Sequence, residues 1–228
     1  MTLKTKIILA VIVELIYIVG SRYVTSNFHE FTPNSEYLRT ILRASSGIAY
    51  YYIFKDYILS FKPSYKFIKS PYIAISIALF FITPLLVGNL YFMGDYTRVL
   101  FAVTSIIVAL REELVFRVLI QNSLESKIRP IFAIIITSLI FTAWHFGAVP
   151  NNLFAFGQVL VNSIFLGLIY SATKSFILVV SLHAIYDALW SLTPVYSNVV
   201  SYNWGFIPLV MAMLFTVVWY SRLKNANK

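Results

Sequence analysis

The chain has 228 residues, of which 59% are hydrophobic and only 12% are charged, and its formal net charge is +9. A soluble domain carries about 25% charged residues, and the mean hydropathy of +0.78 does not fit a surface that faces water. The composition therefore excludes an ordinary soluble domain. The positive charge does not indicate nucleic acid, because Lys and Arg lie mostly between apolar segments. The absence of cysteine excludes disulfides, thiolate metal ligands and a cysteine nucleophile.

Apolar segments of roughly bilayer-spanning length follow one another along the whole chain. They predict an all-α fold, a polytopic transmembrane helical bundle of about eight spans, and a single membrane domain over 1–228. The first contains Glu14 and has no clear small-x-small cleavage site, so we interpret it as a retained span rather than a signal peptide. The segments are 7–24, 37–61, 72–92, 97–122, 130–146, 153–170, 176–192 and 206–222.

The distribution of Lys and Arg predicts how this bundle sits in the membrane. With the N-terminus inside, twelve of the 18 Lys and Arg residues fall in inside stretches, four in outside stretches and two within the fourth segment. Cytoplasmic stretches are enriched in Lys and Arg. We therefore expect the N- and C-termini to be cytoplasmic.

Ionisable side chains deep in a bilayer are costly and mark functional sites, and the fourth segment contains several. Glu113 and Arg117 are four residues apart, so they share a helix face and can pair. Glu112 is turned by about 100° from Glu113 on the same helix, so it can face a cavity instead. Its carboxylate is therefore the one that remains for chemistry.

Two further segments carry histidines, His145 near the end of the fifth and His183 within the seventh. Asp187 follows His183 by four residues, where a carboxylate can orient the imidazole and set its tautomer. At 1.5 Å per residue, Glu112, His145, His183 and Asp187 lie about 21, 22, 14 and 20 Å from the cytoplasmic ends of their segments. The similar depths predict one shared site, within a core of about 97–192.

These residue types support two chemistries that the sequence does not separate. A Glu and a His can deprotonate a water and stabilise the product of its attack on a carbonyl. Alternatively, Glu112, His145 and His183 are candidate ligands of a divalent metal, with zinc the leading choice and an open position for water. Either chemistry permits hydrolysis of an amide.

The motifs together resemble the family of CAAX proteases and bacteriocin-processing enzymes, which includes the type II CAAX prenyl endopeptidases and the bacterial Abi proteins. The matching residues are Glu112, Glu113 and Arg117, then Phe141 and His145, then His183 and Asp187. The resemblance implies an all-helical membrane fold with a cytoplasm-accessible cavity. It also implies that Glu112 and His145 activate a water.

The same resemblance assigns Glu113, Arg117, His183 and Asp187 to completing the site or orienting the substrate. Asp187 stands where the prenyl proteases typically have Asn, which weakens any transfer of prenyl-substrate specificity. Bacterial members of the family are linked to bacteriocin self-immunity and peptide maturation. Within the family, both a metal and a glutamate-activated water are under discussion, so the cofactor stays open.

The resulting expectation is a multi-pass intramembrane endopeptidase of a bacterial plasma membrane, with a peptide or membrane-associated protein as substrate, the lipid bilayer as surroundings and no nucleic acid partner. The alternative is a non-catalytic immunity or scaffold protein that binds a bacteriocin or a membrane sensor. A transporter is less favoured, because no repeated pair of Gly- or Pro-broken helices is present.

Overall fold

The computed structural model describes residues 2–28, 32–60, 62–63, 70–89, 92–146, 153–194 and 203–226, and within these ranges every regular element is a helix. The predicted all-helical fold is therefore confirmed. The long helices are α1 (Leu3–Asn27), α2 (Pro33–Leu59), α3 (Pro71–Val87), α4 (Tyr96–Glu113), α6 (Pro130–Trp144), α7 (Leu153–Thr173), α8 (Phe176–Leu192) and α10 (Ile207–Ala226). The short elements are the π-helix η1 (Leu114–Gln121), α5 (Asn122–Glu125) and the 3-10 helix η2 (Asn203–Phe206).

Local chemistry explains where several helices begin. The side chains of Thr32, Asp95 and Ser175 accept hydrogen bonds from the backbone N–H three residues later, at 3.4, 3.1 and 3.3 Å. Such N-caps satisfy donors that the first turn leaves open. Proline, which has no N–H to lose, occupies the first turn of three helices: Pro33, Pro71 and Pro130.

Two predicted segments differ from the observed helices. The segment expected at 72–92 ends at Val87, because Gly88 and Asn89, with a φ of 54°, close the helix in a turn. The segment expected as one helix over 97–122 is built from α4, η1 and α5, with a π-helix in its centre. The periodicity of the sequence gives no sign of the wider π-helical turn.

Apolar side chains cover much of the outer surface. Among the described helices, two qualify as membrane spans by length and composition, Lys4–Asn27 and Leu153–Thr173, and the first has only 6% of its apolar window buried. Further apolar helices are shorter: Pro71–Val87, Pro130–Trp144, Phe176–Leu192 and Ile207–Leu223. Whether every long helix crosses the membrane stays a prediction.

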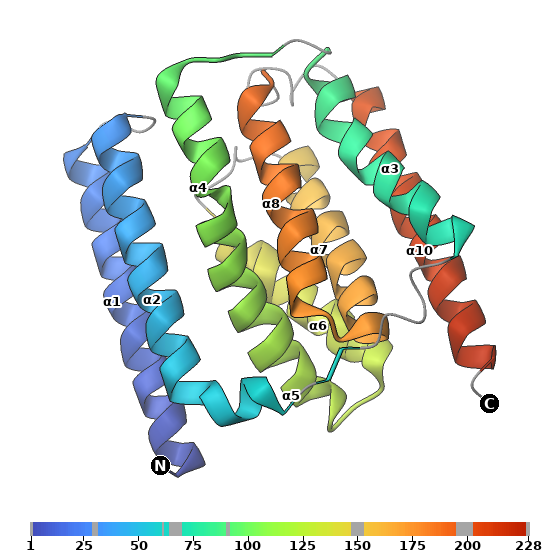
Figure 1. The fold of residues 1–228 in the computed structure, drawn as a ribbon, viewed down its shortest axis with the longest axis horizontal. Coiled ribbons are helices and arrows are strands. Elements are labelled where there is room, and N and C mark those ends of the chain that lie inside the picture. The colour runs from blue at the N-terminus through green and yellow to red at the C-terminus, as the bar shows by residue number, and fades with distance from the viewer. Residues whose placement is uncertain are drawn as a thin grey trace.

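The helices stand side by side in one bundle, with α4 and α8 in the middle (Figure 1). The α1–α2 pair flanks α4 on one side, and α3 packs with α10 on the other. Phe80 of α3 stacks between Phe165 of α7 and Tyr186 of α8, with ring centroids 4.4 and 4.3 Å apart. This aromatic stack fixes the three helices that surround the centre of the bundle.

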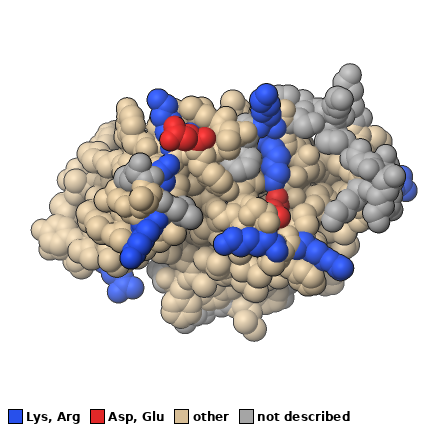
Figure 2. Space-filling model, turned by 90° about the horizontal axis from the view of Figure 1, so that it is seen from below, with Lys and Arg blue, Asp and Glu red and all other residues tan. Residues whose placement is uncertain are grey.

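Both chain ends lie at the same end of the bundle (Figure 1), which we call the termini face. Seen from this side, Lys and Arg predominate over Asp and Glu (Figure 2). The helix directions place most of the predicted inside cations here: Lys4, Lys6, Lys55, Lys62, Lys127, Arg129, Lys174 and Arg222.

Candidate active site

The buried centre of the site is an ion pair within one composite helix. Arg117 Nε donates to Glu113 Oε2 at 2.9 Å, and both side chains are fully buried. Arg117 also donates to Ser163 Oγ of α7 at 3.0 Å. The four-residue spacing allows the pairing, and the pair spans the junction of α4 with η1. Single π-helical turns are frequent at functional sites.

The second oxygen of Glu113 binds His183. Glu113 Oε1 lies 2.8 Å from His183 Nδ1. Since Glu113 is paired with Arg117, it accepts this bond as a carboxylate, and His183 Nδ1 carries the proton. The other ring nitrogen, Nε2, is 3.5 Å from Asp187 Oδ2 and 3.9 Å from Glu112 Oε2. The four-residue spacing had suggested that Asp187, on the same helix, orients His183. In the structure, the hydrogen bond that orients the ring is made to Glu113 on α4.

His145 lies at the C-cap of α6, where that 15-residue helix ends inside the bundle. Its Nδ1 is 2.8 Å from the carbonyl oxygen of Phe141. A carbonyl only accepts, so Nδ1 is the donor and the Nε2 atom is directed to Glu112 Oε2 at 3.8 Å. The Phe141 ring packs 4.4 Å from the His145 ring and 4.9 Å from the Phe116 ring.

Glu112 stands between the two histidines without a direct bond to either. Its Oε2 atom is buried and has no hydrogen-bond partner among the described residues. The distances of 3.8 and 3.9 Å to His145 Nε2 and His183 Nε2 exceed the length of a hydrogen bond. A buried carboxylate oxygen at this separation from two imidazole nitrogens has room for a small bridging molecule.

A cavity of about 860 Å³ in the middle of the bundle is lined by Glu112, His145, His183 and Asp187. Polar residues of α7 and α8 contribute to its wall near the histidines, including Gln158, Asn162 and Tyr186. Gln158 Nε2 donates to the Tyr186 hydroxyl at 2.9 Å. These wall residues were not predicted from the sequence, since an isolated amide or tyrosine in an apolar helix forms no motif.

The described residues contain no group of three or more His, Asp or Glu side chains arranged to hold a metal ion. Zinc requires three or four donors at about 2.0–2.2 Å. Glu112, His145 and His183 do not form such a group, so the geometry lends no support to the zinc alternative.

A second buried polar cluster, not predicted from the sequence, fastens α1 to the site. Arg111 Nη2 donates to both carboxylate oxygens of Glu14, at 2.6 and 2.8 Å. Tyr50 of α2 donates to the same carboxylate at 2.5 Å. The Arg111 guanidinium also lies over the Tyr17 ring, 3.6 Å from its centroid. The sequence shows Glu14 and Arg111 as isolated intramembrane charges, but it does not predict that they pair across 97 positions.

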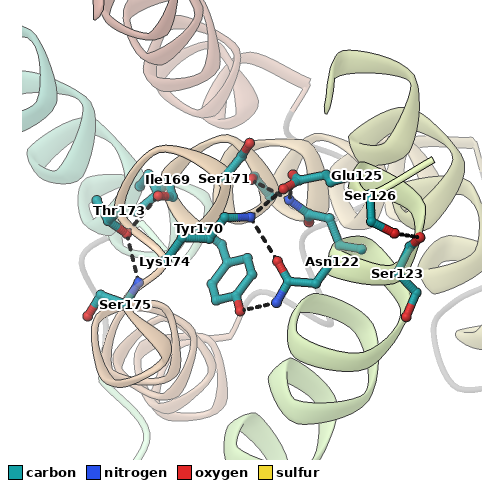
Figure 3. A network of polar contacts seen from close by, with 12 residues as sticks. Asn122, Ser123, Glu125, Ser126, Ile169, Tyr170, Ser171, Thr173, Lys174 and Ser175 are labelled. Carbon is teal, nitrogen blue, oxygen red and sulfur yellow. Dashed lines mark hydrogen bonds and ion pairs between the residues drawn. The ribbon is translucent and has the colours of Figure 1, made fainter. Parts of the chain in front are cut away.

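A third polar network closes the bundle toward the termini face (Figure 3). The Lys174 ammonium bonds to Glu125 and, at 2.8 Å, to Asn122 Oδ1. Asn122 Nδ2 donates to the Tyr170 hydroxyl at 2.7 Å. The network joins α5 to the turn between α7 and α8, so the helices that carry Glu112 and His183 are fixed to each other at that end.

An apolar helical bundle with a Glu and a His facing one internal cavity contains the groups that can activate a water molecule. Residues 95–189 match the family described as type II CAAX prenyl endopeptidase Rce1-like. This match confirms the resemblance to the CAAX protease family that the motifs indicated. The family indicates a CAAX-type protease and a membrane protein. No curated protein and no solved structure matches the chain.

Proposed function

We propose that this chain is a multi-pass intramembrane endopeptidase of a bacterial plasma membrane that cleaves a peptide or a membrane-associated protein through a water activated by Glu112 and His145. The observation that carries the proposal is the buried Glu112 Oε2 atom, which lacks a partner and lies 3.8 Å from His145 Nε2 within the cavity. A water between these two atoms supplies the missing contacts.

The proposed step begins with that water. Glu112 takes one of its protons as the oxygen attacks the carbonyl carbon of the scissile bond, while His145 Nε2 accepts a hydrogen bond that orients it. The carbon–nitrogen bond then breaks, and the proton held by Glu112 passes to the leaving amine. The products are one carboxylic acid and one amine, with a single water consumed.

The remaining polar residues hold this pair in place. Glu113 and Arg117 lock the His183 ring through Nδ1. His183 Nε2 and Asp187 then face Glu112 and form the other side of the substrate position. Such outer partners fix the orientation of the reacting groups. Asp187 in place of Asn adds a negative charge beside the cavity, which argues against assuming a prenylated substrate.

The first test is cleavage of a peptide library by purified protein, with products identified by mass. Wild type is compared with Glu112→Gln and with Glu36→Gln. Glu36 is a matched control, since it lines the same cavity but binds Arg43 at 2.9 Å rather than a histidine. We expect Glu112→Gln to lose cleavage and folded Glu36→Gln to keep it. Equal cleavage by wild type and Glu112→Gln would refute the proposal.

The alternative of a non-catalytic immunity or scaffold protein predicts a different pattern. Glu112→Gln retains the shape of the side chain and its capacity to hydrogen bond. A binding protein therefore keeps its biological effect, such as protection of cells from a bacteriocin, with this substitution. A role in bacteriocin self-immunity through proteolysis requires that the same substitution abolish protection.

A further inference from the structure

The cavity extends from the catalytic residues in one direction only. From Glu112, its wall runs toward the C-terminal turns of α1 and α8 and the first turn of α4. That wall includes Ser26, Arg98 and Ser191. All three lie at the end of the bundle opposite the termini face (Figure 1). We call this end the cavity face.

Toward the termini face the site is closed by packed side chains. Arg117 and Gln121 are fully buried beneath Glu112, and Gln121 Nε2 donates to the backbone carbonyl of Gly167 at 2.9 Å. A Cβ on Gly167 would approach a side-chain atom of Ile134 to 3.0 Å, which shows how closely α7 meets its neighbours here. None of these closing residues lines the cavity.

Below this layer comes the network of Lys174, Glu125, Asn122 and Tyr170 (Figure 3). Two successive layers of hydrogen-bonded side chains thus separate the catalytic residues from the termini face. The side chains of both layers lie outside the cavity lining, so neither layer offers a path for an extended peptide.

The charges distinguish the two faces of the membrane. The sequence assigns twelve Lys and Arg residues to inside stretches and four to outside stretches. The structure places the described members of both groups accordingly, with Lys and Arg prominent on the termini face (Figure 2). An excess of this size puts the termini face in the cytoplasm.

We infer that the site takes its substrate from the extracytoplasmic side, which makes an exported peptide or the outer segment of a membrane protein the substrate class. The inference rests on the proposed function. The cavity runs to the face opposite the chain termini. If the termini are cytoplasmic, the cavity therefore opens on the other side of the membrane, and this replaces the expectation of a cytoplasm-accessible cavity. Arg22, Arg39 and Arg43 on the outer wall add positive charge along the route.

The chain contains no cysteine, so a single introduced cysteine is the only thiol that a labelling reagent can modify in it. Ser26 and Ser126 form a matched pair at the two faces. Both are exposed, and each hydroxyl donates to the carbonyl three residues earlier, at 3.0 and 2.9 Å. Ser26→Cys and Ser126→Cys are expressed separately as full chains in bacterial cells and treated with a membrane-impermeant maleimide. We expect Ser26→Cys to react in intact cells and Ser126→Cys to react only after permeabilisation.

A third variant, Val159→Cys, reports on the cavity itself, since Val159 lines its wall. A small charged methanethiosulfonate added to intact cells is expected to modify it, and retained cleavage or membrane abundance shows that the variant folds. Reaction of Ser126→Cys from outside, or of Val159→Cys only in inverted vesicles or from neither side, would overturn the inference. Labelling needs no substrate, so a failure of the protease proposal alone leaves these results unchanged.

Discussion

Glu113 Oε1 lies 2.8 Å from His183 Nδ1, and this contact joins the charged motif of α4 to the histidine of α8. Because Arg117 holds the other oxygen of Glu113 at 2.9 Å, the imidazole is fixed in one orientation. The second glutamate of the Glu-Glu pair is thus placed to support the first. This division of roles within one dipeptide leads to the first prediction.

Replacing Glu113 by Gln is expected to slow cleavage by about 10- to 100-fold, since outer partners of reacting histidines typically contribute that much. It should also destabilise the fold by about 3–5 kcal/mol, because Arg117 is left buried without a counter-charge. Asp56→Asn is the control, as its side chain is 94% exposed. Cleavage rates and thermal unfolding in detergent measure both effects. A wild-type rate for Glu113→Gln would contradict this role.

Replacing His145 by Ala should lower the cleavage rate by about 100- to 10,000-fold, the usual range for removal of a general acid–base group. Stability should change little, since His145 occupies a helix C-cap beside the cavity rather than the packed core. Phe141→Leu removes the ring against His145 but keeps the carbonyl that orients Nδ1, so a smaller loss is expected. Kinetics of the folded variants decide between these outcomes, and an equal loss in both would be inconsistent with direct action by His145.

Replacing Gly167 by Val should destabilise the protein by about 1–3 kcal/mol, because a Cβ there would approach Ile134 and Gln121 to 3.0 and 3.2 Å. Gly157 on the same helix is the matched control, as a Cβ there meets nothing within 4 Å. The thermal unfolding midpoint of each Val variant is the measurement. Equal midpoints for the two would show that α7 does not pack as described.

Replacing Glu14 by Gln should loosen α1, since it leaves the buried Arg111 guanidinium without its carboxylate. The expected loss of stability is several-fold larger than for Lys6→Gln. The ion pair of Lys6 with Asp56 is 3.9 Å long and lies at the surface. Limited proteolysis of α1 and thermal unfolding follow the effect. Equal proteolysis rates and unfolding midpoints for the two variants would show that the Glu14–Arg111 pair does not hold α1 in place.

Treatment with a strong chelator should leave cleavage unchanged, because the described residues contain no group of three or more His, Asp or Glu side chains arranged to hold a metal ion. The control is addition of zinc after chelation, which should restore nothing. Loss of cleavage with recovery on zinc would favour the metalloenzyme form of the reaction, with Glu112, His145 and His183 as the first ligands to test.

Much of this arrangement was predictable from the sequence, because bilayer-length apolar segments leave little choice but helices. The pairing of Glu113 with Arg117 needed only a four-residue spacing. The convergence of Glu112, His145 and His183 was predicted from their similar depths in the membrane. Local spacing and membrane thickness carried these predictions without any knowledge of long-range contacts.

Other features depended on which helix faces which, and no local pattern encodes that. His183 and Asp187 have ideal spacing, yet His183 bonds to Glu113, 70 positions earlier. The Glu14–Arg111 pair likewise joins distant segments. The direction of the cavity could not be predicted from the sequence either. It depends on α6 ending at Trp144 inside the bundle and on the packing below Arg117.

The central claim is that the Glu112 carboxylate removes a proton from the attacking water. Its most direct test is single-turnover cleavage of one identified substrate by wild type and Glu112→Gln, with substrate affinity measured in parallel. The account predicts that Glu112→Gln binds the substrate with wild-type affinity and cleaves it at least about 100-fold more slowly. Cleavage at the wild-type rate by the folded variant would contradict it.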